Sequence, residues 1–598
     1  MSGKRKEDKW RIPRGMLMQA LVPGTVSALA LALANIADAL TVGIRIGETA
    51  LAAIGILTPV FMIYNVISVS LGSGGGVTHA RLSAGGEKEL AMAHFRRIAR
   101  WALGISVTIG LLGSLFPGFV LRSLAAGEDY PGLWKMCMDY ARPLLAAAPL
   151  FILNVFLYYF VENDDHPRLA AIASTAGGLL DLGLNILLVL ILNRGVRGAV
   201  WATVTAQAVS LGILITHFSS ERGILRIREI LRKHEADPRM VHRYTAGSMR
   251  NGISSAVSYA FLFIFQLMVN HLLMGAGRRG GIPADLYIAV FDLVMNIAYF
   301  FQPLYNAAGD ALQPSAATFS VERDRESLRY VRRLTLLYTL GIGLLIAALL
   351  GILARPVSRL FGLGTGEQLA AAVPAIRIYL LSTPFTGFLV IMGRYYQALR
   401  KPWMVLQGTI LRDAFPLIPA ALLLGLLRPA WIWWAFLPAE ALGALLFQML
   451  RRRAERREKG RQCPMCRAVL TNSNRELGSV VEKITAFCEE QEIPMARAVQ
   501  LQLAVEEICA VTMQKAFSGR KDEYIQVTLV IEEGPRYVLH IRDSAPYFNP
   551  LDLRMEKVRK DMESSIMDSI GVMMVRKQST MMVYRNYQGF NTMTVVYE

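Results

Sequence analysis

Twelve apolar stretches fill roughly the first three quarters of this chain, and the order of the first six recurs in the last six. Most reach the roughly 20 apolar residues that a helix needs to cross a bilayer. Three segments recur at nearly one spacing: His166-Pro167-Arg168 as Arg400-Lys401-Pro402, Trp201–Ala208 as Trp434–Ala441, and Phe95-Arg96-Arg97 as Val331-Arg332-Arg333. Two homologous halves in a polytopic membrane protein are typical of a transporter, with substrate bound between the halves.

The apolar pattern also predicts the domain organisation of a polytopic α-helical membrane protein. We expect twelve transmembrane helices over 16–42, 50–78, 98–120, 134–160, 168–192, 196–218, 248–274, 284–312, 332–352, 370–397, 404–427 and 431–450. They would form two six-helix lobes, 1–235 and 236–455, followed by a basic linker over 456–474. Residues 475–598 are charged and long enough for one soluble domain, which their helix and strand patterns predict to be a cytoplasmic α/β sandwich.

Composition and charge placement indicate lipid rather than nucleic acid as the main partner. The chain is 18% charged, whereas soluble domains carry about a quarter charged residues. Its formal net charge is +18, but Lys and Arg collect in alternate loops between the spans. By the positive-inside rule, this alternation places both termini in the cytoplasm of a multi-pass protein of the cytoplasmic membrane. We expect no nucleic-acid partner.

The cysteines predict neither a disulfide framework nor a metal site. There are five of them, too few and too scattered for a disulfide scaffold. Cys463 and Cys466 have the spacing of half a zinc site, but no second pair or nearby histidine completes four ligands. We therefore expect two reduced thiols.

Acidic residues inside the spans carry the functional prediction for the first half, because an intramembrane charge is costly and usually functional. Asn35 and Asp38 share one face of the first span, and Asp181 and Asn185 share one face of the fifth. If the two faces meet, their oxygens provide ligands for Na⁺. Alternatively, the two carboxyl groups share a proton. The alternative is purely structural hydrogen bonding between helices.

The second half offers fewer candidates. Asp292, with Asn296 four residues later, is expected either to face a substrate cavity or to be structural. Asp413 follows an arginine, and an ion pair would explain it. Glu440 occupies the repeat position of Gln207.

Several short motifs, in order, resemble the multidrug and toxic compound extrusion (MATE) family of secondary transporters. The resemblance covers about residues 15–450, and its motifs are Asn35–Asp38, Gly47–Gly55, Gly72–Gly76, Ala84–Gly86, Gly195–Ala199 and Tyr396–Pro402. It implies twelve helices in two lobes, alternating access, and export of organic cations or drugs in exchange for Na⁺ or H⁺.

The resemblance also bears on the site residues. In one prokaryotic branch the first span carries a functional Asp, matched by Asp38. The fifth span of that branch carries Asn and, four residues on, Asp; here the order is reversed, as Asp181 and Asn185. Another branch uses acidic residues in spans 7 and 10; we find none in those spans, so the resemblance does not place an ion site in the second lobe.

Residues 475–598 resemble the GHKL-type ATPase domain of anti-sigma-factor serine kinases. The motifs are Ala504–Ala510, Asp543–Pro550 and Ser569–Met574. In that family a helix Glu, matched by Glu507, precedes by four residues an Asn that helps to hold Mg²⁺. Here that position is Val511, whose apolar side chain cannot coordinate a hard cation.

The adenine-binding part of this motif set is also incomplete. The Asp that receives adenine is matched by Asp543, but the glycine two residues on is Ala545, and Gly571 alone remains in the lid. We therefore expect a pseudo-ATPase with vestigial nucleotide-binding residues, no required cofactor and doubtful ATP binding. It would bind a regulatory protein or a nucleotide and control the transporter.

The leading functional hypothesis is a cation-coupled antiporter for multidrug or xenobiotic efflux, not an enzyme, with Asp38 and Asp181 carrying the coupling. The alternatives are a flippase for lipid-linked saccharides, a membrane-tethered serine kinase, and a transport-inactive receptor that signals through its tail. An arginine facing the cavity inside the membrane would indicate the flippase.

Overall fold

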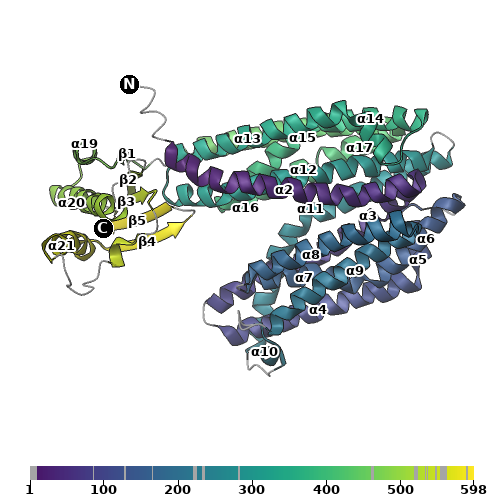
Figure 1. The fold of residues 1–598 in the computed structure, drawn as a ribbon, viewed down its shortest axis with the longest axis horizontal. Helices are drawn as coiled ribbons and strands as arrows, with labels where there is room; N and C mark the ends of the chain where they lie inside the picture. Colours follow the sequence, from purple (N-terminus) through teal and green to yellow (C-terminus); the bar gives the residue numbers. More distant parts are fainter. Residues whose placement is uncertain are drawn as a thin grey trace.

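The computed structural model describes residues 10–84, 87–126, 129–164, 166–219, 225–231, 236–279, 283–458, 463–517, 523–532, 534, 536–545, 548–552, 562–587 and 590–598. Figure 1 shows a body of long helices with a smaller sheet-containing domain at one end. The chain's amino-terminal helix begins at that same end, beside the domain.

The first half of the helical body runs from α2 to α10. Proline occupies the first turn of α6 and α8, where its missing N–H leaves no helical hydrogen bond unmade. The elements are α2 (Arg11–Ile46), α3 (Glu48–Ala84), α4 (Lys88–Leu115), α5 (Pro117–Ser123), α6 (Pro131–Ala146), α7 (Ala148–Asn163), α8 (Pro167–Asn185), the π-helical η1 (Ile186–Ile191), α9 (Gly195–Ile215), η2 (Thr216–Ser219) and α10 (Ile227–Leu231).

The second half repeats this arrangement from α11 to α18. Side-chain caps start three of its helices: Asp237 for α11, Asp324 for α13, and a capping box of Thr365 and Gln368 for α15. The elements are α11 (Pro238–Arg278), α12 (Ala284–Val321), α13 (Arg325–Ile352), α14 (Ala354–Leu360), α15 (Gly366–Ala398), α16 (Pro402–Asp413), α17 (Leu417–Leu427), η3 (Pro429–Ala435) and α18 (Phe436–Glu458).

The predicted spans correspond to these helices, with three of them interrupted. In the described part of the chain, 10 helices are long and apolar enough to cross a membrane, or 11 if α6 and α7, bent by 52°, form one span. The predicted first span lies in α2, which is helical throughout. The fifth span changes to a π-helix at Ile186, and the eleventh breaks between α16 and α17. The twelve-span count is therefore approached but not reproduced.

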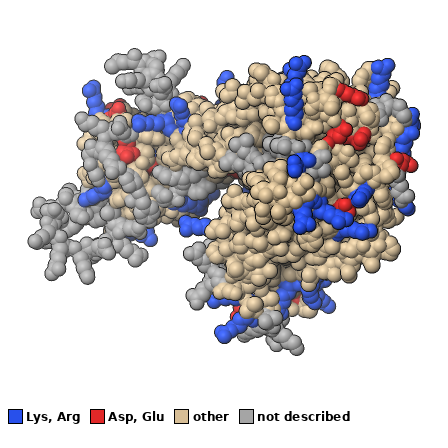
Figure 2. Space-filling view, turned by 45° about the vertical axis from the view of Figure 1, so that its right-hand side comes forward, with Lys and Arg blue, Asp and Glu red and all other residues tan. Residues whose placement is uncertain are grey.

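The surface of the helical body is that of a membrane protein. Large apolar side chains point outward, with Ile352 75% and Leu115 69% exposed. Figure 2 shows that most of the body's surface on the side in view carries neither acidic nor basic residues. Such a surface is stable in lipid and would aggregate in water.

Glycines bring α3 of the first half against α11 of the second. The Gly74 backbone contacts the Ser248 carbonyl, and the Gly252 backbone contacts the Ser70 carbonyl, so closely that neither position has room for a Cβ atom. Farther along, the Asn270 side chain of α11 donates to the Ile56 carbonyl of α3 at 3.4 Å. Small residues allow such close helix packing inside membranes. The two halves therefore share one long antiparallel contact.

The appended domain is an antiparallel sheet with three helices on one face. Its strand order is β1-β2-β3-β5-β4. The elements are β1 (Met465–Thr471), α19 (Asn474–Glu490), α20 (Met495–Val511), the π-helical η4 (Thr512–Ala516), β2 (Tyr524–Glu532), β3 (Arg536–Asp543), η5 (Pro550–Asp552), α21 (Met562–Gln578), β4 (Met581–Tyr587) and β5 (Phe590–Tyr597). The predicted helices and strands correspond closely to these elements.

One boundary differs from the sequence prediction. Residues 456–474 were expected to be a linker, but Met465–Thr471 forms the edge strand β1, paired with β2 from Met465–Val530 to Thr471–Tyr524. The strand is short and contains Arg467, so its sequence pattern is weak; cross-strand pairing with β2 defines it.

The second face of the sheet lies against the helical body rather than in solvent. Thr528 and Arg542 on this face are 1% and 2% exposed. Phe590 of β5 packs on Gly15 of α2, and the Arg11 guanidinium lies 4.5 Å from the ring centre of Tyr524. Both faces of the sheet are thus covered, one by its own helices and one by the transporter-like body (Figure 1).

Candidate functional site

The predicted coupling residues of the first span can be placed only by their backbone. Asn35 and Asp38 lie within α2, and their side chains are outside the described residues. The far end of α2 is anchored beside the fifth span, because Arg45 donates from Nε to Asn193 Oδ1 at 3.3 Å. The helices that carry the two predicted acids are therefore neighbours at this end.

The predicted pair in the fifth span is present as a hydrogen-bonded unit. Asn185 donates from Nδ2 to Asp181 Oδ1 at 3.1 Å, as expected for residues four apart on a helix. Asn185 is buried, and Asp181 is partly exposed. The π-helical turn begins directly after Asn185, and π-bulges are frequent at functional sites.

A polar group that the sequence analysis missed lies between α7 and α9. Asn154 donates to the carboxamide oxygen of Gln207, and Ser210 Oγ donates to Asn154 Oδ1 at 3.1 Å. Gln207 was noted only as the repeat partner of Glu440. Neutral side chains satisfy one another here, so this position of the first half carries no charge.

A second missed cluster gathers three histidines around one carboxylate at the end of α7. Asp164 accepts from His79 Nε2 at 3.1 Å, from His217 Nε2 at 2.9 Å and from the Leu225 backbone N–H at 2.9 Å. His166 lies 3.1 Å from His217, Nδ1 to Nδ1. Burial opposes ionisation of Asp164, but these hydrogen bonds outweigh it and hold its pKa below the usual range. The cluster joins α3, α7 and α9 to the chain that leads into the second half.

Asp292 faces the other half of the molecule, but it is not open to a cavity in this conformation. It is 7% exposed, and Asn296 donates to its Oδ2 at 3.0 Å. A Cβ atom added to Gly55 of α3 would lie 3.1 Å from the Asp292 Cβ. Asp292 and Asn296 are therefore hydrogen-bonded to each other and α3 covers the carboxylate in this conformation, while a role in a substrate cavity stays a prediction.

Charged residues meet where the eleventh span breaks. Arg412 donates to both carboxylate oxygens of Asp413, at 2.6 and 2.7 Å, and to Ser258 Oγ of α11 at 3.0 Å. The predicted ion pair is therefore confirmed. Glu440 of α18, 6% exposed, lies within electrostatic range of both members of the pair.

A cation and two tyrosines lie together between the halves. Arg394 of α15 is within electrostatic range of Tyr159 of α7 and of Tyr259 of α11. Its guanidinium Nε is 3.4 Å from Asp310 Oδ1, and its side chain remains 34% exposed. This group is the clearest set of polar and aromatic side chains that both halves contribute.

At the predicted nucleotide site of the appended domain, the carboxylate of Asp543 is hydrogen-bonded to neighbouring residues. Asp543 accepts from Asn591 Nδ2 at 2.8 Å and from the Ala545 backbone N–H at 3.0 Å, and Tyr584 Oη in turn donates to Asn591 Oδ1 at 2.6 Å. Burial raises the pKa of Asp543 to about 7, although the bond from Asn591 opposes that shift. The carboxylate that would receive adenine is already hydrogen-bonded.

The other residues of that motif set are packed rather than open. The Gly571 backbone lies directly on the Glu507 carboxylate, with no room for a Cβ atom. Val511 is 2% exposed and ends α20. An apolar group at this position brings no oxygen ligand for Mg²⁺, so the residues present do not fit a magnesium–nucleotide complex of the family's type.

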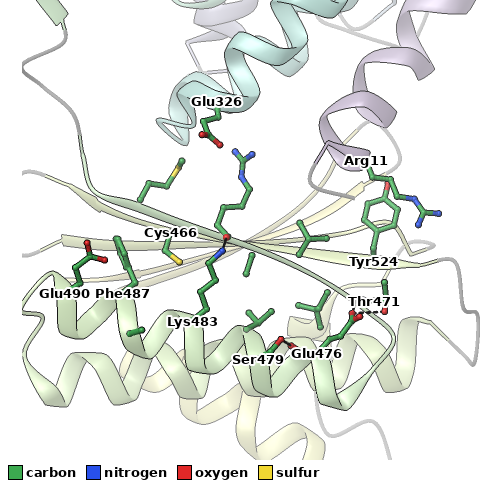
Figure 3. A pocket seen from close by; sticks show the side chains of 17 residues that line it. Arg11, Glu326, Cys466, Thr471, Glu476, Ser479, Lys483, Phe487, Glu490 and Tyr524 are labelled. Atoms are coloured by element: carbon green, nitrogen blue, oxygen red, sulfur yellow. Dashed lines mark hydrogen bonds between the residues drawn. The ribbon is translucent and has the colours of Figure 1, made fainter. Parts of the chain in front are cut away.

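A separate pocket of about 860 Å³ lies where the domain meets the body. Figure 3 shows Lys483, Ser479 and Glu476 of α19 on one side of the sheet edge, with Arg11 and Glu326 of the helical body on the other. Glu476 is engaged with Thr471, and Lys483 donates to the Arg467 carbonyl at 2.6 Å. The pocket lies along the junction between the domain and the body.

Comparison with known proteins agrees with both parts of this architecture. Residues 23–187 match the MatE family, and residues 470–597 match the histidine kinase-like ATPase domain. A probable multidrug resistance protein of Bacillus subtilis is 21% identical over 367 residues, covering 60% of this chain and 74% of the relative. A FAD transporter of Shewanella oneidensis is 22% identical over 421 residues, covering 68% and 87%.

Solved structures agree with the fold of the helical body. An inward-facing multidrug resistance MATE transporter of the MOP superfamily covers 73% of this chain and 99% of its own, with a TM-score of 0.61 and 21% identity. A MOP superfamily transporter from Pyrococcus furiosus covers 75% and 97%, with a TM-score of 0.57 and 22% identity.

These findings define a multi-pass α-helical membrane protein with the fold of MATE transporters. More particularly, one chain combines a helical body similar to the MatE family with a carboxy-terminal domain similar to the histidine kinase-like ATPase domain.

Proposed function

We propose that this protein is a cation-coupled exporter of organic cations, with Asp38 and Asp181 as the coupling carboxylates. The observation that carries the proposal is the hydrogen-bonded Asp181–Asn185 pair, placed where the fifth span changes from α- to π-helix. Partly exposed Asp181 remains accessible to a proton or Na⁺. Because α2 ends beside this span, binding of the cation alters how the two helices pack.

The test is efflux of a fluorescent organic cation from proteoliposomes under a Na⁺ or a pH gradient. Asp38→Asn and Asp181→Asn are each expected to abolish gradient-driven efflux. Asp139→Asn is the matched control, since Asp139 forms a surface ion pair with Arg197, whose side chain is 67% exposed. Efflux that persists after both gradients are collapsed, or in the double variant, would remove the coupling mechanism.

An anionic substrate is the second candidate, and Arg394 favours it. Its side chain is 34% exposed, although Asp310 Oδ1 lies 3.4 Å from its Nε, and Tyr159 and Tyr259 are within electrostatic range of it. A relative is described as a FAD transporter, and FAD combines aromatic rings with anionic phosphates. A competition experiment distinguishes the two candidates. If FAD inhibits organic-cation efflux in the parent protein but not in Arg394→Gln, the substrate is anionic.

Arg412 does not supply the free arginine that would indicate the flippase. Arg412 lies inside the eleventh span, but its guanidinium is engaged by both oxygens of Asp413 and by Ser258. A guanidinium held in this way does not present a free charge to a pyrophosphate.

We further propose that the appended domain regulates transport through its contact with the second half, without turning over ATP. Two ion pairs support this role: Arg542 with Glu322 at the end of α12, and Arg467 with Asp324 at the start of α13. Movement of α12 and α13 during transport would have to carry or break these contacts. A regulatory protein that binds the domain could then act on the transporter.

Titration of the full-length protein with ATP and Mg²⁺ tests the loss of enzymatic function. We expect no submillimolar binding and no phosphotransfer, because Asp543 is occupied and Val511 is no ligand. Phosphotransfer to a serine-containing anti-sigma antagonist would instead establish the kinase.

Positively charged alternate loops further favour cytoplasmic termini in the inner membrane. Labelling of a cysteine placed in the tail checks this orientation.

A further inference from the structure

Glu440 places a buried carboxylate inside the second half. It is 6% exposed, and among the described residues its Oε2 has no hydrogen-bond partner. Three residues on, the Gly443 backbone lies directly against the Leu411 carbonyl of α16. This close approach of α18 to α16 brings Glu440 beside the Arg412–Asp413 pair.

The charges around Glu440 do not balance when it is ionised. Arg412 and Asp413 neutralise each other through two short hydrogen bonds. The other titratable groups that the described residues bring to Glu440 are Tyr379 of α15 and Tyr305 of α12, which carry no positive charge. One net negative charge therefore remains in a site buried inside the protein, where an unpaired charge is costly.

The side chains around Glu440 determine which cation can neutralise its charge. Na⁺, like other hard cations, needs several oxygen ligands. Both Asp413 oxygens are engaged by Arg412, which leaves one carboxylate and neighbouring hydroxyls such as that of Thr386. Arg412 would also repel a metal ion. A proton needs only one carboxylate oxygen.

We propose that Glu440 is a proton-binding site in the second half of this transporter, built at the break of the eleventh span. The repeat supports a role specific to this half. At the equivalent position of the first half, Gln207 is neutral and hydrogen-bonded to Asn154. Transporter ion sites are typically built where membrane helices are interrupted, as α16 and α17 are here. Only its use in coupling depends on the proposed export function; proton binding does not.

Infrared difference spectroscopy of the full-length protein in nanodiscs tests the site without transport. In the parent protein at low pH, we expect a carboxylic-acid C=O band that shifts in D₂O. This band should disappear in one step as pH rises, because Glu440 then loses its proton. In Glu440→Gln that component is expected to disappear. Glu482→Gln, an exposed change on α19, is the control and keeps it. Thermal unfolding of each variant separates loss of the band from loss of the fold.

A second variant tests the site while Glu440 itself is unchanged. In Asp413→Asn, Arg412 loses its partner, so ionised Glu440 pairs with it and the acid band is expected to be lost although Glu440 is intact. An unchanged band in Glu440→Gln, or in Asp413→Asn with the fold preserved, overturns the proposal. Loss of the band on adding NaCl at constant pH would assign the site to Na⁺ instead.

A transport measurement then asks whether the site is used. Efflux driven by a pH gradient is expected to fall at least tenfold in Glu440→Gln. If the parent protein exports nothing, the export function fails while the spectroscopic result stands. Unchanged efflux in a variant that has lost the band would place proton binding at Glu440 outside the coupling step and overturn that part of the inference.

Discussion

Arg542, in the middle of the appended sheet, donates to Glu322 at the end of α12, and both side chains are buried. The pair joins the appended domain to a membrane helix, so it links the position of the domain to that of the second half of the helical body. Arg542 also donates from Nε to Thr592 Oγ1 at 3.0 Å, which fixes its side chain within the sheet.

Breaking this pair is expected to loosen the domain. Arg542→Ala or Glu322→Ala leaves one buried charge uncompensated, at a cost of about 3–5 kcal/mol. Hydrogen exchange in full-length protein should then accelerate in β3 and around residues 319–327. Arg536→Ala is the control on the same strand, because that side chain is 43% exposed. A charge-swapped Arg542→Glu, Glu322→Arg variant should recover part of the protection, and equal exchange in all variants would contradict a docking role.

The α3–α11 contact predicts a steep dependence on glycine. In Gly252→Ala the new methyl group meets the Ser70 carbonyl, and in Gly74→Ala it meets the Ser248 carbonyl, so the helices must separate. We expect a loss of thermal stability in detergent and of transport. Gly247→Ala lies on the same helix with no atom within 4 Å and should be neutral or slightly stabilising. Similar melting curves for Gly252→Ala and Gly247→Ala would refute the close approach.

Asp543 predicts a pH dependence confined to the appended domain. Its pKa is raised to about 7 in the folded protein, above the ordinary value of about 4. The folded state therefore holds the proton more tightly, and the domain loses stability as pH rises from about 4 to about 7, by about 4 kcal/mol at most. Asp543→Asn should remove that loss. Hydrogen exchange in β3 and β5, compared between the two proteins at each pH, measures it; parallel profiles would be evidence against the shift.

Asp164 is expected to behave in the opposite sense. Its pKa lies below the usual range, so its stabilisation is present above about pH 4 and constant near neutrality. Asp164→Ala leaves the buried donors of His79, His217 and Leu225 without their acceptor, at a cost of about 3 kcal/mol or more. Melting in detergent and exchange at residues 225–231 measure the loss. Asp139→Ala, on the surface, should change stability by no more than about 0.5 kcal/mol.

The sequence by itself determined the elements of this protein. Runs of apolar residues located the membrane helices, with ends that differ by up to 10 residues, since burial in lipid depends mainly on local composition. Helix and strand patterns predicted the α/β domain over residues 475–598, and helix spacing put Asp181 beside Asn185 and Asp292 beside Asn296. These relationships involve residues close together in the chain.

Only the tertiary structure decided which distant residues meet. Glu440 was visible in the sequence, but its place beside Arg412 and Asp413 depends on how α18 packs on α16. The strand β1 exists because it pairs with β2, and the polar face of the sheet is buried because the helical body covers it. Such contacts join residues far apart in the chain, and their energies depend on the packed arrangement as a whole rather than on any local pattern.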